Sequence, residues 1–236
     1  MSLSCALEGE SGYAIEALHA GYGDLPVLEG IDLSLPVGQV TAIVGPGGSG
    51  KTTLVRLISR EPAPGLWSTG ALLPAGSAPV VLHQLLATEV EPLSSPLDPM
   101  RIRELERLAR VVWKNQPDAA NELVEQLGAP RSTWQRWQHQ LIRFTETCGQ
   151  LATIYVFDEP DTDAPSRILP WLAAKLRELA RGSVVLLVTH NLLFTRLAAD
   201  RVAVLVEGRL VESGRTEQIF TRPGHPRAQR YLRMGS

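Results

Sequence analysis

The stretch from Gly45 to Thr53 concentrates residue types that bind phosphate. Its glycines let the backbone turn so that successive N–H groups point at one anion, and a helix beginning at Gly50 adds the positive end of its dipole. Lys51 can reach the β- and γ-phosphates of a nucleotide, and the hydroxyl of Thr52 is a hard ligand suited to Mg²⁺. The spacing of a glycine, four residues, Gly-Lys and Thr predicts a phosphate loop between a strand and a helix.

This loop supplies one set of expected nucleotide contacts. A glycine-rich turn that holds no nucleotide is the structural alternative, but such a turn does not account for Lys51 and Thr52 in register. The residues expected to bind nucleotide here are Gly45, Gly47, Gly48, Ser49, Gly50, Lys51, Thr52 and Thr53.

Two adjacent acids, Asp158 and Glu159, follow the apolar run Ile154 to Phe157. Two neighbouring carboxylates at a strand end are costly to bury without a cation. We expect Asp158 to hold Mg²⁺ and Glu159 to orient or deprotonate the attacking water. A pair of exposed acids that ends a strand is the alternative interpretation.

Two further polar residues stand at the ends of apolar runs. His190 follows Val184 to Thr189, and open α/β sheets bind ligands just beyond their strand ends, so His190 is a candidate contact to a γ-phosphate. A histidine in this position can also be a purely structural hydrogen-bonding group. Gln84 follows the run Val80 to His83 and is a candidate for coupling ligand binding to the residues that come after it. A glutamine on its own does not indicate such a role.

The elements expected to position these residues alternate between short apolar runs and helical patterns. This alternation predicts an α/β core with a mostly parallel sheet and crossover helices. The expected strand and helix pairs are Gln39 to Val44 with Lys51 to Ser59, Ile154 to Phe157 with Arg167 to Ala180, and Val184 to Val188 with Leu192 to Ala198. Before them, Tyr13 to Ala20 and Ile31 to Leu35 favour antiparallel strands beside the core.

Two long segments interrupt this pattern. Glu61 to Pro79 holds four prolines and three glycines in nineteen residues, which predicts a loop rather than an element. Residues 85–150 show no strand pattern and are expected to form a helical subdomain inserted into a single domain that spans residues 1–236. Its expected helices are Arg101 to Lys114, Asp118 to Leu127 and Ser132 to Thr147.

A stripe of large side chains runs along the last of these expected helices. Its members follow steps of three and four residues, which is the spacing of one helical face, so the stripe predicts packing rather than a ligand site. They are Trp134, Trp137, Leu141, Phe144 and Cys148.

Composition restricts the class of protein. The 236 residues are 44% hydrophobic and 20% charged, and the 23 Lys and Arg nearly balance the 25 Asp and Glu. No broad basic surface is expected, so nucleic acid is not an expected partner. The longest apolar run, Val184 to Val188, is far short of the roughly 20 residues that a membrane-spanning helix needs. Met1 to Glu10 has no basic stretch followed by an apolar one, so a secretory signal is not expected. We therefore expect a cytoplasmic chain in which Cys5 and Cys148 stay unpaired.

Taken in order, these segments resemble the nucleotide-binding domain of ABC transporters from about Tyr13 to Tyr231. The resemblance implies that Tyr22 stacks on adenine and that the bound ligands are ATP and Mg²⁺. It also implies a subunit that hydrolyses ATP to drive transport through a membrane permease, bound to the inner face of the cell membrane and paired with a second ABC ATPase subunit. The implied roles are Gln84 as the Q-loop glutamine, Asp158 and Glu159 as the Walker B acids, His190 as the switch histidine, and Thr52, Gln84 and Asp158 as Mg²⁺ ligands.

The C-terminal part of the sequence bears on the direction of transport. Gly208 to Gly214 and Gln218 to Pro226 look like the ends of importer ATPases for phosphate, polar amino acids or peptides. The resemblance therefore favours uptake and leaves the solute open, because other subunits choose it.

The chain departs from the family where the signature Leu-Ser-Gly-Gly-Gln is expected. It has Trp134 to Gln138 there, without the serine or either glycine, and a two-residue slip would offer Ser132 and Thr133 instead. Asp161 to Pro165 also lacks the family's usual Ser-Ala-Leu-Asp run. These departures favour an asymmetric pair with a related ATPase whose signature is intact.

Two other classes of function remain open. A soluble nucleotide-binding regulator or scaffold with little ATPase activity is favoured by the altered signature and opposed by Glu159 and His190. A phosphate-loop kinase or GTPase shares the loop, but it does not explain Tyr22, Gln84 and His190 in this order.

Overall fold

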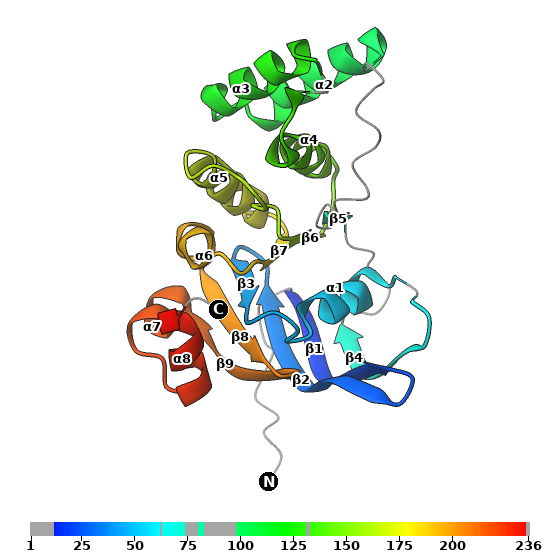
Figure 1. Ribbon diagram of the computed structural model, residues 1–236, viewed down its shortest axis with the longest axis vertical. Coiled ribbons are helices and arrows are strands. Elements are labelled where there is room, and N and C mark those ends of the chain that lie inside the picture. Colours follow the sequence, from blue (N-terminus) through cyan, green and yellow to red (C-terminus); the bar gives the residue numbers. More distant parts are fainter. Residues whose placement is uncertain (1–11, 62, 74–79, 83–97, 131–132, 235–236) are drawn as a thin grey trace.

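The computed structural model describes residues 12–61, 63–73, 80–82, 98–130 and 133–234 (Figure 1). Two β-sheets and a group of helices make up the part described. In chain order the elements are β1 (Gly12–Tyr22), β2 (Leu25–Pro36), β3 (Val40–Val44), α1 (Lys51–Ser59), β4 (Leu66–Leu73), β5 (Val80–Leu82), α2 (Pro99–Val112), α3 (Pro117–Gly128), α4 (Arg136–Cys148), β6 (Ile154–Asp158), α5 (Leu169–Ala180), β7 (Val184–Val188), α6 (Leu192–Ala198), β8 (Arg201–Val206), β9 (Arg209–Arg215), α7 (Thr216–Thr221) and α8 (Pro226–Met234).

The larger sheet has the strand order β5-β6-β7-β3-β8-β9, and all its neighbouring strands are parallel except β8 and β9. Every residue of β3, β6 and β7 is buried, as expected for parallel strands that are covered on both faces. The predicted α/β core is therefore confirmed.

The smaller sheet, β2-β1-β4, is antiparallel and lies beside the core. Its inner face, helix α1 and one face of the larger sheet enclose a single apolar cluster that includes Leu28, Leu54 and Val156. The expected antiparallel strands near the N-terminus are thus confirmed, and they hold α1 in place.

The expectation that Glu61 to Pro79 is a loop is wrong. Strand β4 lies within it and pairs along β1, from Tyr22 opposite Leu66 to Ala14 opposite Leu73. Prolines flank the strand instead of interrupting it, so the composition of the whole segment concealed it. Pairing with β1, a contact distant in sequence, stabilises β4 where local propensity does not.

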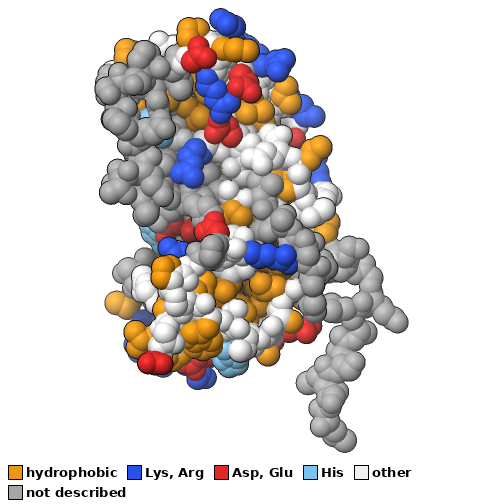
Figure 2. All heavy atoms as spheres, turned by 90° about the vertical axis from the view of Figure 1, so that its right-hand side faces the viewer, with side chains coloured by type: hydrophobic (Ala, Val, Ile, Leu, Met, Phe, Trp, Pro, Cys, Tyr) orange, Lys and Arg blue, Asp and Glu red, His pale blue; other side chains and the backbone are white. Residues whose placement is uncertain are grey.

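Helices α2, α3 and α4 lie between β5 and β6 in sequence and form one end of the molecule (Figure 1). Aromatic rings join this group to the sheet: Trp113 stacks on Phe144 at 5.8 Å, and Phe144 meets Phe157 of β6 at 5.0 Å. Trp134 and Trp137 are buried as well, so the stripe expected to pack does pack. Figure 2 shows side chains of both charges interspersed over this end of the face it presents.

Helix α4 begins at Arg136, later than the expected start at Ser132. Gln135 has extended dihedrals (φ −82°, ψ 160°) and is the residue that precedes the helix, which fixes its first turn. Ser132 lies outside the described residues.

The C-terminal helices α7 and α8 lie against β8 and β9. Glu212 of β9 accepts hydrogen bonds from the backbone N–H groups of Gly224 and His225, at 2.7 and 3.0 Å. This carboxylate fixes the turn that leads into α8.

Candidate functional site

The loop between β3 and α1 is shaped by close approach to its neighbours. A Cβ on Gly45 would lie 2.0 Å from the carbonyl oxygen of Leu205 on β8, so only glycine fits there. Gly50 has φ +103°, a left-handed conformation that favours glycine, and it precedes the first residue of α1. The turn expected from the motif thus has a steric basis.

Helix α1 begins without a polar side chain to cap it and without an acid in its first turn. The first N–H groups of an α-helix lack partners inside the helix and carry partial positive charge. A phosphate group is a suitable partner for them, so the start of α1 can serve as an anion site.

Lys51 is nearly buried and folds back over the loop. Its Nζ donates to the carbonyl oxygens of Gly45 (2.8 Å) and Pro46 (2.9 Å) and to Ser49 Oγ (3.3 Å). Burial lowers the pKa of Lys51, and the charges of Glu159 and Asp158 partly oppose that effect. Its three acceptors are neutral, so a phosphate oxygen would be a stronger partner.

The acid pair lies at the end of β6, next to β7. Asp158 is 6% exposed, and burial, followed by the charge of Glu159, raises the pKa of Asp158 to about 6 despite the nearby Lys51. Glu159 has φ +47° and donates its N–H to the carbonyl of Val188 at 2.7 Å. The left-handed backbone at Glu159 turns the chain at the sheet edge.

His190 lies beside Glu159, a contact that the sequence did not indicate. Its Nδ1 is 3.1 Å from Glu159 Oε1, and the histidine ring is largely exposed while the glutamate is mostly covered. Lys51, Asp158, Glu159 and His190 therefore gather at the carboxyl ends of β3, β6 and β7, which are adjacent in the sheet.

The three hydroxyl-bearing residues around the start of α1, namely Ser49, Thr52 and Thr53, differ in exposure. Thr52 is exposed, whereas Thr53 and Ser49 are buried. Thr52 is therefore the one of the three with a side chain open to a ligand. Gln84, expected beside them, lies outside the described residues.

Tyr22 lies at the end of β1 and is linked to α1. Its hydroxyl accepts a hydrogen bond from Arg56 Nη1 at 3.2 Å. Arg56 was not among the residues expected at the site, because nothing in the sequence indicates that the second turn of α1 meets the end of β1.

Sequence reasoning also missed Asp161 and Tyr231. Thr189 Oγ1 donates to Asp161 Oδ1 at 2.8 Å and accepts from the N–H of Asn191 at 3.0 Å, so the loop after Glu159 is tied to the loop that carries His190.

Tyr231 of α8 is buried, its pKa is raised by that burial, and the backbone of Gly45 partly offsets the shift. A helix almost 190 residues away along the chain thus packs beside the phosphate loop.

Residues at the start of α4 form hydrogen bonds with one another. The N–H of Gln135 donates to Gln138 Oε1 at 2.8 Å, and Trp137 Nε1 donates to Gln135 Oε1 at 2.7 Å. Thr133, which a two-residue slip would offer in place of the signature serine, donates its hydroxyl to the carbonyl of Pro130 at 2.7 Å.

A phosphate loop after β3 and an acid pair at the end of β6, two strands of one parallel sheet with β7 between them, define a phosphate-loop α/β protein. The family described as "ABC transporter" matches residues 28–162, more than half of the chain. The chain therefore belongs to the ABC transporter family, and ATP binding follows from that membership.

Individual relatives agree with this assignment. The chain is 31% identical to the Fe(3+) ions import ATP-binding protein FbpC of Pseudomonas fluorescens, over 94% of this chain and 66% of that protein. It is 30% identical to the hemin import ATP-binding protein HmuV of Streptomyces coelicolor, over 91% of this chain and 82% of that one. A bacterial Atm1-family ABC exporter, solved with ATP bound, shares the fold with a TM-score of 0.69 at 22% identity, over 97% of this chain and 43% of that chain.

Across the described ranges, no helix is long and apolar enough to cross a membrane.

The raised pKa of Asp158 predicts an unusual pH dependence of stability. The folded chain keeps this proton where the unfolded chain releases it, so its stability falls as pH rises from about 4 to about 6 and stays low above that range. At about pH 7.5, Asp158→Asn should stabilise the nucleotide-free chain on the order of 2 kcal/mol, and at about pH 4 it should have little effect. Urea unfolding in EDTA at both pH values measures this.

Asp24→Asn is the matched control, since it removes the same charge from an exposed position. If Asp158→Asn were as stable as the wild type at both pH values, this result would contradict a free-energy cost for burying the ionised Asp158 carboxylate.

Proposed function

We propose that this chain is the ATP-hydrolysing subunit that powers solute uptake through a partner membrane permease. The observation that carries the proposal is the gathering of Lys51, Asp158, Glu159 and His190 at the ends of three adjacent strands. A cation, two acids and an imidazole around a glycine loop are the groups that γ-phosphate hydrolysis requires.

The residues present fit Mg²⁺ bound together with ATP. Asp158 is a buried carboxylate that lacks sufficient positive charge around it, and Thr52 exposes a hydroxyl one residue after Lys51. Both are hard oxygen ligands of the kind that Mg²⁺ prefers, and Gln84 is the third proposed ligand. When bound, Mg²⁺ would offset the negative charge of the phosphates.

Lys51 would leave the carbonyls of Gly45 and Pro46 and pair with phosphate oxygens, while the N–H groups at the start of α1 bind the same anion. Tyr22, held by Arg56, would stack on the adenine ring. The remaining contacts of the loop are proposed for Gly45, Gly47, Gly48, Ser49, Gly50 and Thr53.

Glu159 would act as the base that accepts a proton from the attacking water. His190 Nδ1 holds its carboxylate at 3.1 Å and, being exposed, can reach a γ-phosphate. The hydrogen bond between Thr189 and Asp161 keeps the two loops together, so the base and the histidine would move as one unit.

Uptake rather than export is supported by the relatives FbpC and HmuV, both named as import proteins. Working with a permease would place the chain at the cytoplasmic face of the membrane. The helices α2, α3 and α4 would be an inserted subdomain that contacts the permease, since Gln84 precedes them in the sequence and would link them to the γ-phosphate region.

A second candidate function, a nucleotide-binding regulator with little turnover, is favoured by the start of α4. The signature of one subunit must offer free donors to the γ-phosphate held by the other, and here Gln135, Gln138 and Thr133 already bond within their own segment. We therefore propose an asymmetric pair in which a related ATPase supplies the intact signature.

Lys51→Ala should abolish Mg²⁺-dependent ATP binding, because the backbone donors of the loop cannot replace the positive charge. Lys114→Ala removes a charge from an exposed position and should bind ATP as the wild type does. Calorimetry on both folded variants measures the affinity, and an unchanged Kd in Lys51→Ala would disprove the assignment of the loop.

Glu159→Gln should keep nucleotide and Mg²⁺ binding but stop turnover, because the amide has the shape of the acid without its basicity. ATP should then remain bound after incubation with the active partner, as measured by filter binding and phosphate release. Wild-type release rates in this variant would remove Glu159 from the mechanism.

The purified chain alone should hydrolyse ATP about 10²- to 10³-fold more slowly than the reconstituted pair. The reason is that donors to the negative charge developing on the γ-phosphate are missing. ATPase activity is measured over a concentration series that spans dimer formation. Robust turnover that rises with the square of concentration, without a partner, would contradict the asymmetric pair and favour capping by Ser132 and Thr133.

A further inference from the structure

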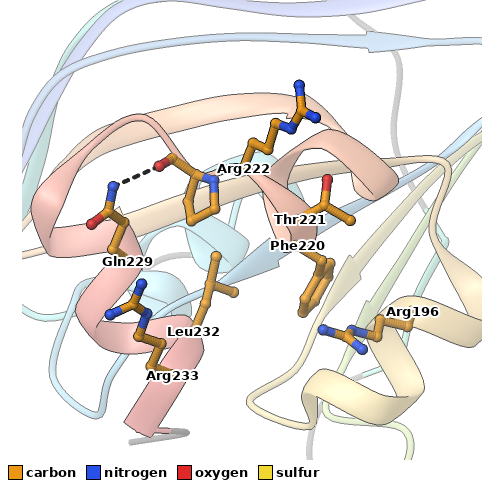
Figure 3. A pocket seen from close by; sticks show the side chains of 8 residues that line it. Arg196, Phe220, Thr221, Arg222, Gln229, Leu232 and Arg233 are labelled. Atoms are coloured by element: carbon orange, nitrogen blue, oxygen red, sulfur yellow. Dashed lines mark hydrogen bonds between the residues drawn. The ribbon is translucent and has the colours of Figure 1, made fainter.

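A polar cavity lies away from the phosphate loop, where α6, α7 and α8 meet (Figure 3). Its volume is about 370 Å³. Phe220 and Leu232 point into the space between the helices, with Arg196 on one side and Arg233 on the other, and Arg222 stands at the rim. A cavity of this size is within the range of small-molecule sites.

The charge of this cavity is of one sign. Every charged side chain that lines it is an arginine, namely Arg196, Arg222 and Arg233. Within the described part of the chain, none of the three forms an ion pair. By contrast, Arg227, which is on α8 like Arg233, pairs with Glu207. Because the chain as a whole carries a net charge of −2, this cluster does not follow from a generally basic composition.

The orientation of Arg196 suits a planar anion. Its guanidinium lies 4.5 Å from the centre of the Phe220 ring, so one face is covered by an aromatic surface. Stacking leaves the N–H groups at the edge of the guanidinium free, and this edge matches two oxygens of a phosphate or carboxylate. Three positive charges match a dianion better than a monoanion.

We propose that this cavity binds a phosphate group, held mainly by Arg196 of α6 and Arg233 of α8, with Arg222 at the entrance. The side chains lining it include no acid or cysteine, and the one hydroxyl among them, that of Thr221, donates to the carbonyl of Glu217 at 2.7 Å, so the proposal is one of binding without reaction. The phosphate can belong to a free phosphate compound or to a lipid headgroup, and the shared chemistry is recognition by guanidinium groups.

The site connects α6 and α8, two helices that adjoin residues of the candidate nucleotide site. Helix α6 starts just after His190, with Asn191 as its N-cap, and Tyr231, which precedes Leu232, lies beside Gly45. A phosphate group that bridges α6 and α8 would therefore join the two helices that support the histidine and the phosphate loop. The proposal itself stands on the arginines and does not depend on the proposed function.

The test is calorimetry with inorganic pyrophosphate in a Lys51→Ala background, where the phosphate loop is disabled. Arg196→Gln/Arg233→Gln should weaken binding about tenfold or more, the loss expected for charge-assisted hydrogen bonds. Arg103→Gln/Arg230→Gln is the matched control, because it also removes two positive charges, from exposed positions that do not line the cavity. It should change the affinity by less than about twofold.

A second arm uses vesicles of phosphatidylcholine with phosphatidic acid, and co-sedimentation as the readout. Pyrophosphate binding that the double variant loses supports a free ligand, and vesicle binding alone with the same loss supports a lipid headgroup. The proposal is overturned if neither probe binds, if Arg196→Gln/Arg233→Gln binds as tightly as its parent, or if the control Arg103→Gln/Arg230→Gln weakens binding as much as Arg196→Gln/Arg233→Gln does. Since all variants share the Lys51→Ala background, this outcome is independent of whether the phosphate loop binds ATP.

Discussion

The structure depends on burying opposite charges at one edge of a parallel sheet. Lys51 and Asp158 are 9% and 6% exposed, and their pKa values move in the directions that favour the neutral forms. Desolvation therefore exceeds the attraction between them. A phosphate for the lysine and a cation for the carboxylate would restore what each has lost, so the folded chain stores a cost that ligand binding relieves.

Strand β7 is the element that brings these charges together. It lies between β6 and β3, with Asp158 opposite Val188 on one side and Ile43 opposite Val188 on the other. The acid pair and the phosphate loop thus leave the sheet at the same level, and His190 follows β7 two residues later. Because parallel strands are held in register along their whole length, a shift of β7 would displace all three groups at once.

The sequence predicted those parts of the site that depend on neighbours in the chain. A phosphate loop is defined by spacing within a few residues, so Lys51 and Thr52 were found without any knowledge of the fold. Arg56, Asp161 and Tyr231 were not found, because their roles arise where separate elements meet. Strand β4 was missed for the same reason: its segment is rich in proline and glycine, and only its pairing with β1 makes it a strand.

The start of α4 shows how a motif can be altered without loss of the fold. Trp137 is buried against the core and is covered by Arg167, whose guanidinium lies 5.5 Å from its ring, so this tryptophan contributes packing that a glycine cannot. Its indole N–H in turn holds the Gln135 side chain. The backbone N–H of Gln135 already donates to Gln138 Oε1, so in the proposed pair this donor would not be free for the nucleotide of the second subunit. Two ATP sites formed by this chain and a related ATPase would therefore differ, because only one of them would be closed by the start of this α4.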